Sequence, residues 1–188
     1  MNKPTILNIG LFIFIILSVF SCGDADKPSE KDIVKKPELF EDRIKQNLTV
    51  TLDYANAHQG KINDTIQVKQ PSLLRKVYEK NGYGTIWSYK GKWNNTGDSL
   101  YHFIENSKEQ GLFPSDYHFH ILAGIDSLLR TDTLANKDAA LLSRADVMMT
   151  DALFEISRHL KRGRLPYDSL NLRKDTIILD ENFYAKVL

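Results

Sequence analysis

The histidines offer the first candidate chemistry, because several lie near a carboxylate in the middle of the chain. Nitrogen and oxygen ligands of the kind that zinc prefers are carried by His102, Asp116, His118 and His120. His118 and His120, however, are alternate residues near a helix start, where positions two apart diverge by about 200° around the axis. Their side chains cannot converge on one ion. We therefore expect surface histidines and neither a metal site nor a cofactor.

Nucleophilic catalysis would need an activated serine or cysteine. Ser143 and Ser157 lie within a helical pattern and lack the strand-to-helix elbow that exposes a catalytic serine. Cys22 is the only cysteine, so no intramolecular disulfide can form and no second thiol is present. The sequence as given therefore predicts no catalytic residue.

Cys22 stands between an apolar run and a polar segment. Residues 1–21 contain Lys3 and then an apolar stretch that is too short for an ordinary membrane span but typical of a signal peptide. The stretch Val19-Phe20-Ser21-Cys22 resembles the lipobox of bacterial lipoproteins, in which the cysteine becomes the acylated first residue. We expect residues 1–21 to be a signal peptide and Cys22 to be lipidated. An ordinary secretory signal that contains a cysteine is the alternative.

The residues after Cys22 are charged, contain proline and include few large apolar side chains. Such a composition predicts a flexible tether over residues 22–37. The lipoprotein resemblance implies a lipid-anchored protein on the periplasmic side of the cell envelope. It favours the outer membrane, because Gly23 stands where an aspartate retains some lipoproteins at the inner membrane.

Aromatic side chains gather between two predicted helices, at Tyr83, Trp87, Tyr89 and Trp93. Their faces could stack on sugar rings, or they could pack beneath the preceding helix. Core packing is the preferred interpretation, with Trp93 in the loop as the main exception. Trp93 and Tyr89 are therefore the candidate contacts for glycan or a protein partner.

Length and charge limit the remaining choices. A chain of 188 residues with 42% hydrophobic content can bury one sizeable core. Its 25 basic and 24 acidic residues nearly cancel. A neutral chain gives no reason to expect nucleic acid as a partner.

Hydrophobic spacing predicts a mostly α-helical fold. Residues 38–69 form a mixed accessory segment, in which 48–52 and 63–68 alternate like strands that could pair as a small hairpin. Helices are expected from Pro71 to Asn81, from Thr96 or Asp98 to Gly111, from Tyr117 to Arg130, and from beyond Asn136 to Gly163. We expect residues 168–188 to begin a following segment that is truncated at Leu188.

A specific hinge interrupts the helical region. Gly111 suits a left-handed helix cap, and Pro114 can neither continue a helix nor donate an amide hydrogen. Ser115 or Asp116 is the expected cap of the next helix. A hinge of this kind indicates tertiary packing.

Three blocks of sequence carry a family resemblance. They are Val77-Tyr-Glu-Lys-Asn-Gly-Tyr-Gly-Thr-Ile-Trp87, Glu109-Gln-Gly-Leu-Phe-Pro-Ser-Asp-Tyr-His118, and Asp146-x-x-x-Thr150-Asp-Ala152 leading to His159-Leu-Lys-Arg-Gly-Arg164. In this order and spacing they resemble the helical scaffold domain of bacterial L,D-transpeptidases, the enzymes that cross-link peptidoglycan stems. The resemblance covers about residues 70–167.

The resemblance implies that the catalytic residues lie in a different domain from the helical scaffold. In that family a downstream domain holds a histidine and a Ser-x-Gly-Cys nucleophile motif, which this sequence lacks, so we transfer no catalytic residue. Structural roles are implied for Gly111, Leu112, Pro114, Tyr117, His118, Asp146, Thr150, Gly163 and Arg164. Asp146 and Thr150, one helical turn apart, are expected to fix a neighbouring helix through buried hydrogen bonds.

The resemblance implies the non-catalytic scaffold of a transpeptidase, which orients the catalytic domain in cell-wall cross-linking. Its partners would be peptidoglycan or that domain, with the membrane reached through the lipid. The alternative is a stand-alone lipoprotein that serves as an adaptor or binding module without catalysis. An enzyme in its own right has no supporting constellation of residues.

Overall fold

The computed structural model describes residues 27–164 and 179–188. Its α-helices are α1 (Phe40–Ala57), α2 (Pro71–Lys80), α3 (Asn95–Glu105), α4 (Phe119–Thr131), α5 (Ala139–Arg162) and α6 (Glu181–Ala185). The short 3-10 helices are η1 (Pro37–Leu39), η2 (Ser107–Gln110), η3 (Pro114–Tyr117) and η4 (Ala135–Lys137). Strands β1 (Ser88–Tyr89) and β2 (Lys92–Trp93) form a small antiparallel sheet. The predicted mostly α-helical fold is confirmed.

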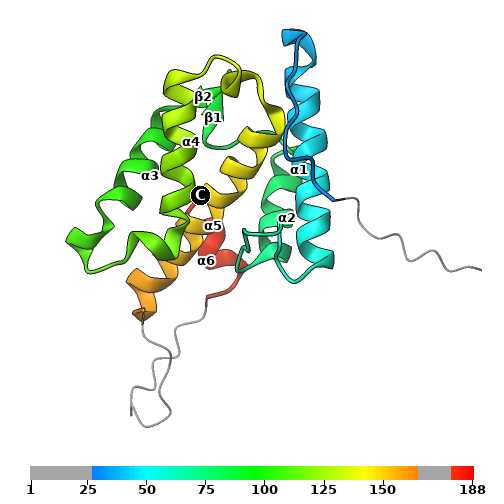
Figure 1. Cartoon of the computed structure of the whole chain (residues 1–188). Coiled ribbons are helices and arrows are strands. Elements are labelled where there is room, and N and C mark those ends of the chain that lie inside the picture. The colour runs from blue at the N-terminus through cyan, green and yellow to red at the C-terminus, as the bar shows by residue number, and fades with distance from the viewer. Residues whose placement is uncertain (1–26, 165–178) are drawn as a thin grey trace, which may run out of the picture.

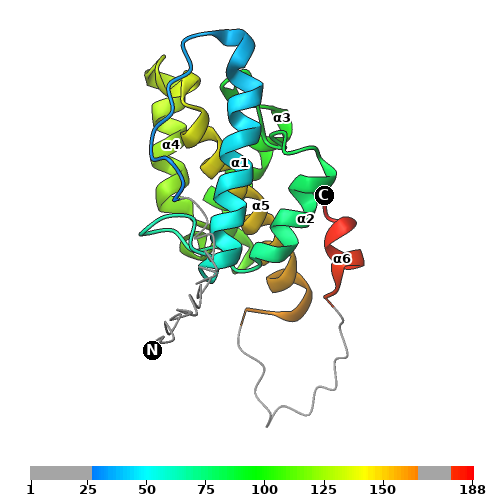
Figure 2. The ribbon, with the colours of Figure 1, turned by 90° about the vertical axis from the view of Figure 1, so that its right-hand side faces the viewer.

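Helix α5 is the central element of the fold. Helices α1 and α2 pack on one side of α5 and on each other, whereas α3 and α4 lie on the other side (Figure 1). The short α6 lies beside α2 (Figure 2). Its Tyr184 ring lies 4.8 Å from the ring of Phe154 on α5, measured between centroids. A helix that is covered on several sides carries apolar residues around most of its circumference.

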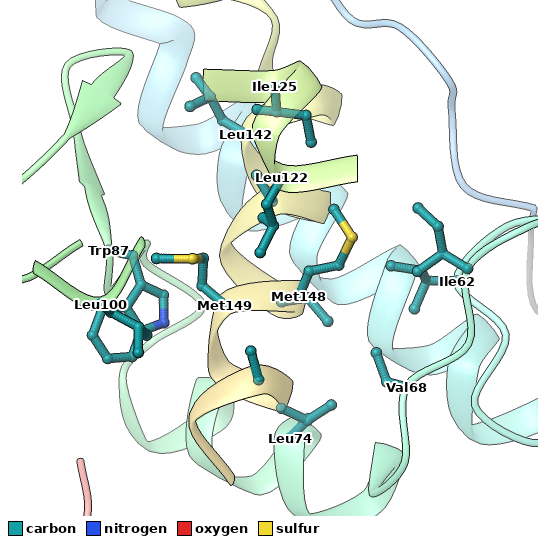
Figure 3. Packing of buried hydrophobic residues seen from close by; sticks show 14 of the residues in the cluster. Ile62, Val68, Leu74, Trp87, Leu100, Leu122, Ile125, Leu142, Met148 and Met149 are labelled. Carbon is teal, nitrogen blue, oxygen red and sulfur yellow. The ribbon is translucent and has the colours of Figure 1, made fainter. Parts of the chain in front are cut away.

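Neighbouring side chains of α5 serve different parts of the core. Successive residues leave a helix about 100° apart. Figure 3 shows Met148 on the side of Ile62, and Met149 on the side of Trp87 and Leu100. All five side chains are buried and belong to one apolar cluster. Helix α5 therefore joins both sides of the core.

The segment that precedes α1 lies against the helices. The amide of Val34 donates to the carbonyl of Lys137 at 2.9 Å, and the Val34 side chain is buried. The guanidinium of Arg144 donates to the Ser29 carbonyl at 2.7 Å. These bonds correct the flexible tether expected over residues 22–37, because its described part, from position 27 onward, is held by the domain.

The strand pair expected near the N-terminus is also corrected. Leu48, Thr51 and Leu52 are buried residues of α1 and follow helical spacing, so residues 48–52 are not a strand. Residues 63–68 lie in a loop closed by one isolated bridge between Lys61 and Gln67. The small sheet lies instead at β1 and β2. Residues 38–69 are thus an integral part of the core.

The hinge follows its predicted beginning but not its predicted end. Gly111 has a φ of 71°, the left-handed conformation expected of a helix cap. The next helix, α4, begins after His118, which has a φ of 58°, and no side chain caps it. Asp116 instead binds Arg164, since its Oδ2 accepts from Nε at 2.5 Å. The cap predicted at Ser115 or Asp116 is therefore wrong.

Several predictions concern residues that the structure does not describe or describes in part. The signal peptide over residues 1–21 and the lipidation of Cys22 lie outside the described residues. Of the segment 168–188, positions 179–188 are described, and Asp180 caps α6 by accepting from the amide of Phe183 at 3.0 Å. This part packs on the helical domain, through Tyr184 and Phe154. None of the described helices has the length and apolar character needed to cross a membrane.

We predict that Gly97→Ala destabilises the fold by about 2 kcal/mol or more, because α3 begins in tight contact with the preceding loop. A Cβ atom at Gly97 would stand 2.1 Å from the carbonyl oxygen of Trp87, so the backbone would have to shift. Urea unfolding measures the free energy.

The matched control is Gly124→Ala in α4, where a Cβ atom would meet nothing within 4 Å. This change should stabilise the protein by roughly 0.5–1 kcal/mol, because alanine has the higher helix propensity. Equal losses at both glycines would show that the contact with Trp87 carries no special cost.

Candidate functional site

A buried carboxylate on α5 organises the aromatic segment. Oδ1 of Asp146 accepts from the hydroxyl of Tyr78 at 2.7 Å and from the amide of Ile86 at 2.8 Å. Oδ2 accepts from the amide of Trp87 at 3.0 Å. Asp146 is fully buried. One side chain thus ties α5 both to α2 and to the loop that follows it.

Thr150 completes this arrangement one helical turn further along. Its Oγ1 accepts from the indole Nε1 of Trp87 at 2.8 Å and lies 2.8 Å from the Tyr78 hydroxyl. Thr150 is also fully buried. Asp146 and Thr150 thus both contact Tyr78 of the neighbouring α2 through buried hydrogen bonds. Tyr78 and Trp87 are the partners that sequence reasoning did not identify.

The electrostatics of this cluster suit a structural role. Burial raises the pKa of Asp146 to about 6, while hydrogen bonds from Ile86, Tyr78 and Trp87 oppose the rise. Its three partners all donate to its oxygens, as they would to an ionised carboxylate. Burial, and next the charge of Asp146, raise the pKa of Tyr78 well above its usual value. Neither group is open to a substrate for proton transfer.

The fixed loop carries a tight hairpin. Lys90 and Gly91, between β1 and β2, both have positive φ, 49° and 80°, as a two-residue turn of type I′ requires. Tyr89 is 61% exposed at its edge. Trp93 is partly buried against the core, and its Nε1 donates to Asp126 at 3.1 Å. Tyr89, and not Trp93, is thus the exposed aromatic residue, and glycan contact at either stays a prediction.

A groove of about 840 Å³ lies beside this hairpin. Its walls come from three separate stretches of chain, within residues 34–45, 84–94 and 136–137. Val34, Phe40, Ile44 and Tyr89 give it apolar surface. Its cationic side chains are Lys35, Lys45, Lys90 and Lys137, and its one carboxylate is Glu41. Such a surface can bind a ligand that combines apolar groups with negative charge.

A second polar cluster joins the hinge to the end of α5. Tyr117 is buried, and its hydroxyl lies 2.8 Å from Nδ1 of His159. Nη2 of Arg158 lies 2.7 Å from Nε2 of His159. Because a guanidinium can only donate, Nε2 must accept, which places the imidazole proton on Nδ1. Burial, and then the charge of Arg158, lower the pKa of His159, in agreement with a neutral ring.

The remaining family residues support the same junction. Nε2 of His118 lies 2.9 Å from Oδ2 of Asp151, and Oδ1 of Asp151 accepts from the Lys69 amide at 2.8 Å. Leu112 and Pro114 are buried, and Gly163, with a φ of 85°, ends α5. Across residues 27–164 and 179–188, no three His, Cys, Asp or Glu side chains are grouped as a metal site.

The comparisons with known proteins include a match to a protein family. A family model described as Scaffold domain matches residues 72–186. The match includes all three sequence blocks and extends through α6. No curated protein matches the chain, and neither does any solved structure.

We predict that Asp146→Asn destabilises the protein by about 2 kcal/mol, because an asparagine has only one acceptor oxygen. In either orientation its amide nitrogen would face the backbone N–H of Ile86 or Trp87, which would lose its partner. Urea unfolding at pH 7.5 measures the loss.

Glu79→Gln is the control, because it makes the same chemical change at an exposed position of α2. We expect it to change the free energy of unfolding by no more than about 0.5 kcal/mol. A wild-type stability for Asp146→Asn would mean that the buried carboxylate does not hold the loop.

Proposed function

The chain belongs to the Scaffold domain family, and from this premise we propose that it is the non-catalytic scaffold of a peptidoglycan L,D-transpeptidase. In this role it orients a catalytic domain during cell-wall cross-linking. The observation that carries the proposal is that three separated sequence blocks meet on one helix. Asp146 joins the first block to the third, and the contact between His118 and Asp151 joins the second block to the third.

The proposal assigns no chemistry to this chain. Thiolate attack on an amide carbonyl needs an activated cysteine with a base beside it. Cys22 is the sole cysteine of the sequence, and the proposed lipid would occupy its thiol. The buried histidine, His159, is hydrogen-bonded to Tyr117 and Arg158. The nucleophile would therefore belong to another part of the complete protein.

We also propose that the protein is held at the periplasmic side of the cell envelope by a lipid on Cys22. The support is the sequence alone: a basic residue, an apolar run and a single cysteine precede the folded domain. Several acyl chains would hold it firmly, since each buried methylene contributes about 0.8 kcal/mol.

The scaffold proposal predicts cross-linking by the product of the complete reading frame. That protein, purified and incubated with muropeptides, should yield cross-linked stem peptides in mass spectrometry. The 188-residue chain alone should yield none, because it supplies no nucleophile.

Two outcomes would contradict the proposal. Cross-linking by the 188-residue chain would mean that it is an enzyme in its own right. A complete gene product that forms no cross-links would favour the alternative, a lipoprotein adaptor or binding module without catalysis.

The anchor proposal predicts that Cys22→Ser abolishes lipidation. Cells grown with an alkyne-bearing fatty acid should label the wild-type protein, and the variant should carry no label, because serine offers no thiol. Label that persists in Cys22→Ser would place the lipid elsewhere. Absence of label from both proteins would favour an ordinary secretory signal.

A further inference from the structure

The groove beside the hairpin is cationic, although the whole chain is nearly neutral. Its walls hold four lysines and a single carboxylate, that of Glu41. All four lysine side chains are exposed, and none forms an ion pair with any residue that the structure describes. Most arginines of the same domain are paired, as Arg43 is with Asp32 at 2.9 Å. The groove therefore offers positive charge that no described residue neutralises.

Other polar side chains of the groove are already used. The hydroxyl of Thr85 donates to the Ser88 carbonyl at 2.8 Å. Asn94 donates to the Ile86 carbonyl at 2.8 Å and accepts from the amide of Gly97 at 2.8 Å. Recognition of a ligand's polar groups thus falls mainly to the lysines. The ammonium of Lys90 lies 5.1 Å from the centre of the Tyr89 ring, so charge and an aromatic face stand together.

The shape and the lining favour a short peptide over a long polyanion. A volume of about 840 Å³ lies within the range of sites that enclose a small ligand. Val34, Phe40 and Ile44 supply apolar surface for aliphatic side chains. Nucleic acid and other polyanions are bound by extended basic surfaces on strongly basic domains, which this chain does not have.

We propose that this groove binds the acidic stem peptide of peptidoglycan, with its carboxylates on the lysines and its small side chains on the apolar wall. The inference rests on the proposed function, which names the cell wall as the working environment. It adds a second, non-catalytic site for the stem. A scaffold with such a site holds a strand of the wall while the chemistry proceeds elsewhere.

The test is calorimetric titration of the 188-residue chain in detergent with a disaccharide tetrapeptide as the probe. Because this chain lacks the catalytic motif, any binding belongs to the scaffold. The double variant Lys35→Glu, Lys45→Glu should raise the Kd at least tenfold, since it reverses two charges of the groove. Both positions are exposed, and circular dichroism checks that the variant stays folded.

The control is the double variant Lys108→Glu, Lys186→Glu, which reverses two exposed lysines that do not line the groove. Its Kd should stay within twofold of the wild-type value. Added salt should weaken wild-type binding, because exposed charges are screened. The disaccharide without its peptide should not bind.

Three results would overturn the inference: no binding of the probe, equal binding by the groove variant, or equal binding of the peptide-free disaccharide. The last would make the groove a glycan site. The binding titration and the cross-linking assay test different claims, so their outcomes can be told apart. Cross-linking without groove binding would end this inference alone, whereas groove binding without cross-linking would end the transpeptidase proposal and leave a binding module.

Discussion

The fold depends on the need of one buried carboxylate for hydrogen-bond donors. Asp146 cannot stay ionised inside the core unless its two oxygens are paired, and the donors come from α2 and from the loop at residues 86–87. Helix α2 and the loop at residues 86–87 must therefore contact α5 at the same position along its axis. Once they do, the hairpin turn and the start of α3 follow, because Asn94 caps α3 and also binds the Ile86 carbonyl. A local electrostatic requirement thus sets the geometry of a surface groove.

The two ends of α5 serve different purposes. Its N-terminal half holds the loop that forms one wall of the groove, through Asp146 and Thr150. Its C-terminal part holds the hinge, through His159 and the contact between Asp151 and His118. In both clusters buried side chains are hydrogen-bonded to one another, which rigidifies the domain. Rigidity of this kind suits a domain whose work is to position something else.

The sequence correctly predicts the features that a short local pattern of residues determines. Gly111 and Gly163 end helical patterns with left-handed or open conformations, and Asp146 and Thr150 share a helix face one turn apart. The prediction was wrong where one local pattern fitted both a strand and a helix. The stretch 48–52 alternates like a strand, but its leucines also continue an apolar stripe that begins at Ile44. This stripe packs against α5, which stabilises the helical conformation. The groove could not be predicted, because its lysines come from distant segments and carry no common spacing. Trp93 was misjudged for a related reason, since its partner Asp126 lies on α4.

The segment before α1 gives the domain a mechanical property. Its backbone is hydrogen-bonded to the beginning of α5, where the amide of Ala139 donates to the Asp32 carbonyl at 2.9 Å. The guanidinium of Arg144 donates to the carbonyls of Ser29 and Glu30. Because Asp32 also accepts from Arg43 and Asn47 of α1, a pull applied at position 27 reaches α1 and α5 together. Several bonds between neighbouring stretches of chain then share the load.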